Sequence, residues 1–407
     1  MEFLNSKSRL FVVSEFVDKS QNSTGYYWNK IIQGISAVKP ETYVISTKSS
    51  CDLAQLERGS ETYLCVSDDK KYKKNSLLGR IFGQVVLSLK FFLKIATNVK
   101  RNDIIFSGTN PAFVLIFIFL LKPFIGFRWV LLVHDVFPEN LIAAKLIRRD
   151  SILFKIAKYL FDHVYLKADA LIAIGRDMQE LLVSKTKDRV LVSYIPNWVD
   201  SNDVPAMPRS LETLLPGQEL NDRVVFQFFG NLGRVQGVDA LLSAIRLVKN
   251  RRAKFIFIGG GASESILQSF IREYPDLDVS FVPSLPFSRN DEGLAACDVA
   301  IVSLASGMKG LGVPSKAYFS LAADKPILVV GDEGSELELL VAEHPDVGWY
   351  CDSANINELA GLIDEICAQD LNTYVLKPRS LVIEKFDYKV AINQYLSLFD
   401  RVLGCTK

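Results

Sequence analysis

The stretch 299–316, VAIVSLASGMKGLGVPSK, joins an apolar run to a glycine-rich turn. Val299–Leu304 has the nearly continuous apolar character of a parallel strand that is covered on both faces. Gly307–Lys316 then contains three glycines and one proline, and the small residues of Ala317–Pro326 favour a helix. A strand, a glycine-rich turn and a helix in this order predict one unit of a doubly wound parallel sheet.

The same turn is a candidate anion site. Where a glycine-rich turn enters a helix, free backbone N–H groups and the positive end of the helix dipole face outward. Lys316 opposes that dipole, and a phosphate in front of it accounts for a lysine at this position. We therefore expect the loop to hold the diphosphate of a nucleotide-linked substrate, with an ordinary strand-to-helix turn as the alternative. The expected contacts are Lys309, Gly310, Leu311, Gly312, Val313, Pro314, Ser315 and Lys316.

Length and composition indicate two α/β domains in a reducing compartment. The chain has 407 residues, of which 49% are hydrophobic and 23% charged, which is ordinary for a soluble α/β protein of about two domains. Its six cysteines are scattered without a C-x-x-C pair, and its three histidines are far apart. We expect neither a structural zinc site nor a histidine metal site.

The formal net charge of +1 hides a basic first half. Residues 1–200 hold 28 Lys+Arg against 19 Asp+Glu, whereas residues 201–407 hold 19 against 27. The basic half is expected to face a phospholipid surface, a lipid pyrophosphate or a nucleic acid, unless the charge is simply solvated. Lys70–Lys74 leads into an apolar helix, Ser76–Val99, which we expect to lie on an anionic bilayer. The alternative is a helix that faces the core, with lysines that extend to solvent.

The most hydrophobic segment is not expected to span a membrane. Pro111–Val133 is interrupted by Lys122, Pro123, Gly126 and Arg128, and a span needs about 20 apolar residues. We expect a buried helix, a turn and then a strand from Arg128. Because Met1–Arg9 lacks the pattern of a signal peptide, the expected location is cytoplasmic, peripheral at the inner face of the cell membrane.

Apolar runs that end in polar or turn residues recur along the whole chain. In the first half they begin near residues 10, 103, 128, 170 and 190, and after the polar linker 201–222 they resume near 224, 255, 279, 299 and 326. The pattern predicts two Rossmann-like domains, 1–203 and 204–385, followed by a C-terminal helix within 386–407. Ligands of such sheets bind beyond the carboxyl ends of the strands, where His134 and Asp135 follow one run. A structural histidine, with Asp135 as a helix-start residue, is the alternative.

Three common nucleotide and hydrolase motifs are missing. Gly259–Gly261 follows a strand, but position 264 is glutamate where the third glycine of a dinucleotide fingerprint would stand. The sequence contains neither G-x-x-x-x-G-K-[ST] nor G-x-S-x-G, which argues against a P-loop NTPase and a serine hydrolase.

Taken together, the motifs resemble the retaining GT-B glycosyltransferases, in particular the bacterial group that builds capsule, O-antigen and exopolysaccharide. The resemblance covers nearly the whole chain and rests on the order and spacing of weak motifs. These are HDVFPE at 134–139, IPNWVD at 195–200, FGNLGRVQG at 229–237, VPSK at 313–316 and LAADKP at 321–326.

The resemblance implies the function and the site. The second domain would bind a nucleotide-diphosphate sugar, the first domain a lipid-linked (polyprenyl pyrophosphate) saccharide acceptor, and the C-terminal helix would pack back on the first domain. Neither a cofactor nor a metal is implied, because basic side chains and helix N-termini neutralise the diphosphate. His134, Asp135, Arg234 and Lys316 are the expected catalytic residues. The further expected contacts, besides the loop 309–315, are Ser23, Thr24, Gly25, Asn110, Gly230, Asn231, Gly233, Pro283 and Ser284.

The chain departs from that family at the nucleoside end. Many relatives hold the ribose with a glutamate, and counting back from Pro326 places Phe319 at its position. Gln236 stands where relatives often have lysine, and Asp324 where they have glycine. A non-catalytic GT-B subunit that supports a partner transferase is therefore the alternative function. Nucleic-acid modification ranks last, since no nucleic-acid-binding motif is recognisable.

Overall fold

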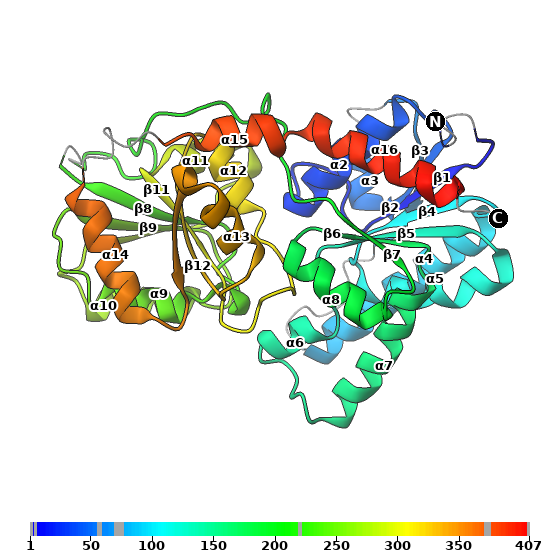
Figure 1. Cartoon of the computed structure of the whole chain (residues 1–407), viewed down its shortest axis with the longest axis horizontal. Coiled ribbons are helices and arrows are strands. Elements are labelled where there is room, and N and C mark those ends of the chain that lie inside the picture. Colours follow the sequence, from blue (N-terminus) through cyan, green and yellow to red (C-terminus); the bar gives the residue numbers. More distant parts are fainter. Residues whose placement is uncertain are drawn as a thin grey trace.

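The computed structural model describes residues 3, 6–54, 59–68, 77–218, 222–369 and 376–404. Two parallel sheets lie side by side, each flanked by helices (Figure 1). The first sheet has seven strands in the order β3-β2-β1-β4-β5-β6-β7 and the second has six in the order β10-β9-β8-β11-β12-β13. The predicted pair of doubly wound sheets is therefore confirmed.

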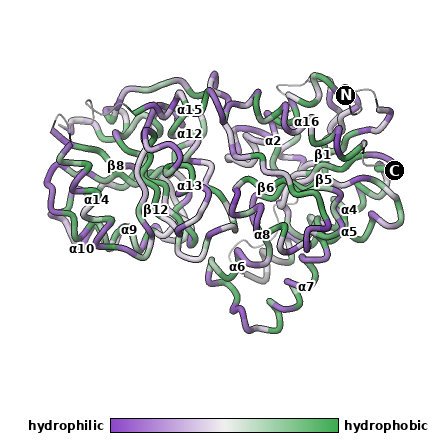
Figure 2. The backbone as a smooth tube through the Cα atoms, viewed as in Figure 1, coloured by the Kyte–Doolittle hydropathy of each residue, from purple (hydrophilic) through white to green (hydrophobic). Residues whose placement is uncertain are grey.

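The strands coincide with the apolar runs of the sequence. Strands β1, β4 and β6 are buried at every position, as expected for parallel strands with helices on both faces. Figure 2 shows hydrophobic segments concentrated at the strands and hydrophilic segments mainly on outer turns. The first sheet consists of β1 (Leu10–Val13), β2 (Thr42–Thr47), β3 (Thr62–Val66), β4 (Ile104–Ser107), β5 (Arg128–Val133), β6 (Ala170–Ala173) and β7 (Leu191–Tyr194). The second consists of β8 (Val224–Phe229), β9 (Ala253–Ile258), β10 (Val279–Val282), β11 (Val299–Ser303), β12 (Ile327–Gly331) and β13 (Gly348–Asp352).

Helices of the first sheet divide between its two faces. Successive crossovers that run in one direction along a parallel sheet lie on one face, because each crossover is right-handed. One layer accordingly contains α4 (Leu77–Asn98), α5 (Ala112–Ile125), α7 (Ile152–Lys167) and α8 (Arg176–Thr186), which contact one another in that order. Helices α2 (Ser23–Ser36) and α3 (Lys48–Ala54) belong to the other face, and the short α6 (Glu139–Ala143) follows β5.

The second sheet carries α9 (Val238–Ile245), α10 (Glu264–Glu273), α11 (Asn290–Ala295), α12 (Lys316–Ala322), α13 (Glu336–Glu343) and α14 (Ile356–Ala368). The chain then returns through α15 (Pro378–Lys385) to α16 (Tyr388–Gly404), which packs against α2 beside the first sheet (Figure 1). Phe399 of α16 stacks on Phe3 with ring centroids 4.8 Å apart and meets Phe106 of β4 at 5.2 Å. The last helix thus completes the core of the first sheet.

The hydrophobic segment after residue 111 forms the expected helix, turn and strand, but the helix is not buried as a whole. Helix α5 includes Pro123, is capped by Gly126, whose φ of +80° suits glycine, and is followed by β5 at Arg128; Val114, Leu115 and Ile118 are buried, whereas Leu120 and Phe124 are exposed because one side of the helix faces outward. Among the described residues, no helix combines the length and the apolar character that crossing a bilayer requires. The predicted helix over 76–99 is present as α4, whereas the basic run 70–74 lies outside the described residues.

Candidate active site

A cavity of about 720 Å³ opens between the carboxyl ends of the second sheet and the start of α2. The second sheet contributes loop residues that follow β8, β9 and β10, together with α11 and α12. The first sheet contributes the turn that leads into α2. The residues that line it include Asn22, Ser23, Tyr26, Gln227, Phe229, Gly230, Asn231, Gly260, Ser284, Phe287, Asn290, Pro314, Ser315, Lys316, Phe319 and Ser320.

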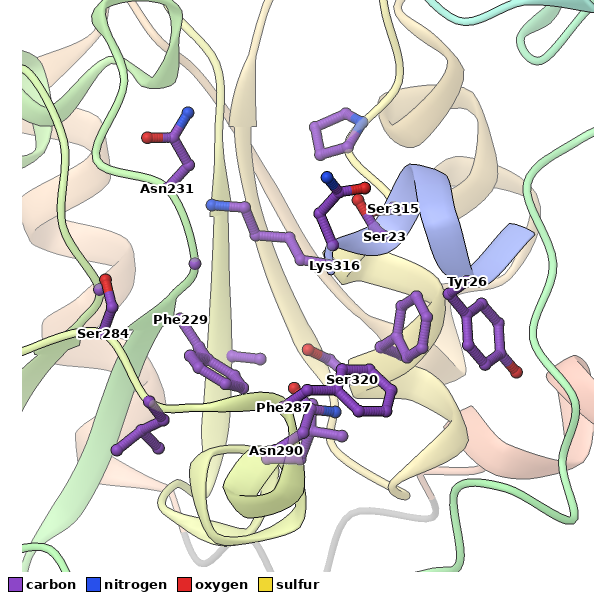
Figure 3. A pocket seen from close by; sticks show the side chains of 18 of the residues that line it. Ser23, Tyr26, Phe229, Asn231, Ser284, Phe287, Asn290, Ser315, Lys316 and Ser320 are labelled. Atoms are coloured by element: carbon purple, nitrogen blue, oxygen red, sulfur yellow. The ribbon is translucent and has the colours of Figure 1, made fainter. Parts of the chain in front are cut away.

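Lys316 is the one charged side chain among the described residues that line this cavity. It is the first residue of α12, and its side chain extends toward the loop that carries Asn231 (Figure 3). Its Nζ is buried without a hydrogen-bond partner and lies 3.4 Å from the centroid of the Phe228 ring. Desolvation lowers the pKa of the Lys316 ammonium to about 7. An anion in the cavity would supply the missing partner and favour the charged amine.

The glycine loop divides into two parts with different surroundings. Its last residues, Pro314–Lys316, line the cavity. Its middle contacts the first sheet's half of the chain instead, because Gly310 N donates to Asp177 Oδ2 at 2.7 Å and Leu311 O accepts from Val136 N at 3.0 Å. The Asn197 side chain also donates to the carbonyl of Val313.

The expected contacts Lys309, Gly310, Leu311, Gly312 and Val313 are consequently not brought into this cavity. Near the beginning of the loop, the N–H groups of Gly307 and Lys309 donate to the carboxylate of Asp332. Asp332 therefore holds the beginning of the loop and Asp177 holds its middle. Only the last residues of the loop, which lead into α12, face the cavity.

Two further glycine-rich turns form the cavity wall at the ends of β8 and β9. Gly230 and Asn231 line the cavity, and Gly259 lies so close behind them that a Cβ there would be 1.8 Å from the Gly230 carbonyl oxygen. Of the other predicted contacts here, Arg234 begins the short helix η2 (Arg234–Gln236) with an exposed side chain. Neither Arg234 nor Gly233 lines the cavity. Ser284 does so, whereas Pro283 does not.

The start of α2 forms the opposite wall. Ser23 and Thr24 have side chains suited to an N-cap, but Asn22 caps the helix, since its side chain accepts from Gly25 N at 2.9 Å. The cap leaves Ser23 free to face the cavity. Gly25 was among the expected contacts, but it does not line the cavity. The carbonyl oxygen of Asp18 lies 2.1 Å from where a Cβ of Gly25 would stand.

His134 and Asp135 line a second cavity of about 330 Å³ within the first sheet's half. Thr24 and Asn110 line it as well, together with Gln84 and Phe113 of the outer helices. Burial lowers the pKa of the His134 imidazole to about 4 and raises the pKa of the Asp135 carboxyl to about 6. Asp135 keeps an exposed surface in the cavity, and the protein atoms packed around it account for the desolvation.

The glycine loop also passes close to two residues that line this second cavity. A Cβ on Gly312 would stand 3.4 Å from the carbonyl oxygen of His134 and 3.5 Å from Asp135 Oδ1. The segment 312–316 thus runs from the His134 turn to Lys316 and the larger cavity. Among the described residues, no group of three or more His, Cys, Asp or Glu side chains could hold a metal ion.

Several lining residues were not predicted from the sequence. Gln227, Phe287, Asn290 and Ser320 belong to no motif, and only their places in or near strand ends and helices could have indicated them. Phe229 begins the motif at 229–237 but was not among the expected contacts. Phe319 lines the cavity and meets Tyr26 of α2 edge-on, with ring centroids 5.1 Å apart. The described lining contains no carboxylate.

An ionic cluster joins the two halves beside the glycine loop. Glu336, at the start of α13 and only 1% exposed, accepts from the backbone N–H and the guanidinium of Arg176 at 2.7 and 3.0 Å. Tyr194 donates to the other oxygen of Glu336 at 2.6 Å. These bonds fix the start of α8 against the second sheet's half.

Comparison with known proteins identifies clear relatives. Residues 214–378 match the family model described as glycosyl transferases group 1. Over 400 residues the chain is 40% identical to the "probable glycosyltransferase WbjE" of Pseudomonas aeruginosa, which covers 98% of this chain and 100% of that protein. It is 21% identical over 226 residues to the "putative colanic acid biosynthesis glycosyl transferase WcaI" of Escherichia coli K12, covering 53% and 54% of the two chains.

Solved structures match the fold over the whole chain at low sequence identity. Sucrose-phosphate synthase of Thermosynechococcus elongatus superposes with a TM-score of 0.78 at 13% identity, covering 98% of this chain and 100% of that one. HepE of Anabaena, solved in complex with UDP-glucose, superposes with a TM-score of 0.70 at 14% identity, covering 97% and 99%.

Proposed function

The chain belongs to the group 1 glycosyltransferases and has their GT-B fold, and we propose that it moves a sugar from a UDP-linked donor to a lipid-linked saccharide. The donor proposal rests on Lys316, because its Nζ is buried beside the larger cavity without a hydrogen-bond partner. Burying an amine in this way is costly unless a ligand charge completes the site. A nucleoside diphosphate supplies such a charge, and the UDP complexes of HepE support the choice of nucleotide.

The two cavities support a division of roles. The larger cavity would hold the donor, with its diphosphate between Lys316 and the turn at Gly230 and Asn231. The smaller cavity would admit the acceptor beside His134 and Asp135. Because the segment 312–316 connects the two, the reacting sugar would lie near it. We infer that the chain acts in polysaccharide synthesis, which the name of the E. coli relative supports, and that it does so at the cytoplasmic face of the membrane.

The proposed reaction proceeds with retention and without a metal. The acceptor hydroxyl would attack the anomeric carbon from the face that the diphosphate leaves, and the leaving phosphate oxygen would take the hydroxyl proton. The Lys316 ammonium and backbone N–H groups at the start of α12 would stabilise the negative charge that develops on the diphosphate. The imidazole of His134, kept neutral by burial, would donate or accept a hydrogen bond to the sugar without adding charge.

A thermal-shift panel with UDP, GDP and CDP tests the donor site. A nucleotide at 100 times its Kd stabilises the folded state by about 2.7 kcal/mol. We expect UDP to stabilise the native chain and Lys309→Ala, whose side chain does not line the cavity, and to stabilise Lys316→Ala much less. No stabilisation of the native chain by any of the nucleotides would contradict the proposal.

A non-catalytic nucleotide-binding subunit is the second candidate function. The lining of the larger cavity favours this function. It includes Phe319 of α12, and its described residues include no carboxylate. Both functions predict UDP binding, so turnover separates them. Release of UDP from UDP-sugars in the presence of a lipid-linked acceptor favours the enzyme, and binding without release favours the subunit.

A further inference from the structure

The outer surface of the α4–α5–α7 layer exposes a concentration of large apolar side chains. Sixteen large hydrophobic residues are exposed in the described part of the chain, and ten of them belong to these helices and the turn before α7. We call these ten residues the outer helix face. They are Phe82, Leu89, Leu93, Leu120, Phe124, Leu146, Ile152, Leu153, Ile156 and Tyr159.

The start of α7 is a highly exposed part of this face, and packing within the chain does not explain its apolar side chains. Ile152 and Leu153 are 76% and 67% exposed, while Phe154 and Phe161 on the inner side are buried. The inner side is well packed, since Phe161 stacks on Phe137 with ring centroids 5.4 Å apart. A surface helix with a packed inner face is normally polar outside. The α6–α7 turn and the start of α7 project from the rest of the molecule in Figure 1.

The exposed apolar residues at the start of α7 lie among cations. Lys145, Arg148, Arg149 and Lys155 are all exposed within the segment 144–159. The one acidic residue of this segment, Asp150, pairs with Arg148 at 2.8 Å. Figure 2 shows hydrophobic and hydrophilic segments together in this region. Apolar side chains within a cationic border are the composition that binds the interface of an anionic bilayer.

We propose that the outer helix face docks on an anionic lipid bilayer, with the start of α7 inserted at the level of the headgroups. Charge favours this occupant over a second copy of the chain. A symmetric dimer through this face would bring the same cationic segment against itself. The segment 144–159 contains five Lys and Arg residues and one Asp, so it offers little opposite charge for such a contact.

Docking at this face would also bring the chain to its lipid-linked acceptor, and this part of the inference rests on the proposed function. The smaller cavity is lined by Gln84 of α4 and Phe113 of α5, which are helices of the docking layer. A bilayer against that layer would bring the headgroup of a lipid-linked saccharide close to His134 and Asp135. The donor cavity lies at the second sheet and would stay accessible from the aqueous side.

Vesicle flotation tests the proposal with the full chain. Vesicles of phosphatidylcholine with phosphatidylglycerol are compared with vesicles of phosphatidylcholine alone. The triple variant Ile152→Ser, Leu153→Ser, Ile156→Ser removes exposed apolar groups, and Arg149→Gln with Lys155→Gln removes two charges. The matched control is Ile266→Ser with Ile383→Ser, whose side chains are 46% and 52% exposed in the second half of the chain.

We expect the native chain and the control to float with the anionic vesicles, and high salt to weaken this binding. The charge variant should bind about 25-fold more weakly, since each basic residue near the surface contributes roughly a factor of five. The apolar variant should lose flotation at a vesicle concentration that saturates the native chain.

Two results overturn the proposal: native protein that fails to bind anionic vesicles, and variants that bind as well as the native chain. A light-scattering dimer that both α7 variants convert to monomer would also overturn it, because the face would then be a protein interface. UDP-dependent thermal shifts of the same variants distinguish a failure of the docking proposal from a failure of the donor-site proposal. The altered side chains line neither cavity, so unchanged shifts are expected whether or not docking is lost.

Discussion

Replacing Lys316 by methionine should remove both the charge that binds the donor and the pH dependence of binding. The amine has a pKa of about 7 in the free protein, so it is mostly charged at pH 6 and only about 3% charged at pH 8.5. A bound diphosphate favours the ammonium and raises its pKa. Binding above pH 7 therefore takes up a proton, and the affinity must fall as the pH rises.

The magnitude follows from the free-state pKa. If the bound pKa lies above the range studied, affinity for UDP-glucose drops about 30-fold between pH 6 and 8.5, or about 2 kcal/mol. At pH 8 each binding event takes up about 0.9 proton. Lys316→Met loses a charge-assisted hydrogen bond worth about 1.5–3 kcal/mol, so its affinity at pH 6.5 should be about 10- to 150-fold weaker.

Isothermal titration calorimetry in buffers of different ionisation enthalpy measures both quantities. UDP-glucose is preferable to UDP because its diphosphate has no terminal phosphate that titrates near neutrality. Lys309→Met serves as the control, since this lysine does not line the cavity. Native binding without proton uptake at pH 8, or uptake that persists in Lys316→Met, would refute the assignment of the phosphate site to Lys316.

The same variant should be more stable than the native chain without ligand. Burial lowers the pKa of Lys316 from 10.5 to about 7, so between these values the unfolded chain binds a proton that the folded chain does not. The free energy of unfolding of the native chain therefore decreases as the pH falls from about 10.5 to 7. Methionine removes this penalty, which corresponds to about 1.36 kcal/mol per unit of pKa difference.

Three more predictions concern other residues. His134→Ala should abolish sugar transfer, while its affinity for UDP stays within about twofold of the native value, because the imidazole lines the smaller cavity. Turnover and calorimetry measure the two effects, and an equal loss of both would contradict this. With no carboxylate in the described lining of the larger cavity, UDP and 2′-deoxy-UDP should bind within about threefold of each other, and competitive titration would reveal a larger preference. Asn22→Ala should cost about 1 kcal/mol in urea unfolding, since its side chain caps α2, whereas Ser23→Ala should cost much less.

The fold was predictable because the signals that encode it are local. Each buried strand is an apolar run of four to six residues, and the turns that follow contain glycine or proline at strand ends such as Gly230 and Gly259. Counting back from Pro326 predicts that Phe319 stands where relatives have glutamate, and this correspondence stays a prediction. The helix α12 then brings Phe319 into the cavity, three positions after Lys316.

The details of the site depend on contacts that the sequence does not reveal. Asn22, Ser23 and Thr24 are all good N-cap residues, so propensity alone could not decide which one caps α2. The partner of Gly310 is Asp177, 133 positions earlier in the chain. Nothing near either residue marks the pair, and only the packing of the two halves brings them together.

That pairing gives the glycine loop a structural role in addition to the proposed binding of phosphate. Asp177 is buried and accepts N–H groups from Gly310 and Met178, so displacing the loop would leave a buried carboxylate without its partner. The same loop leads into α12, whose first residue, Lys316, has an amine without a hydrogen-bond partner. A diphosphate that draws Lys316 toward Gly230 would therefore act on a segment that Asp177 and Val136 hold beside the His134 turn. Donor binding would therefore be coupled to the position of the acceptor cavity through residues 310–316, because hydrogen bonds hold Gly310 and Leu311 at the start of this short segment and Lys316 stands at its end.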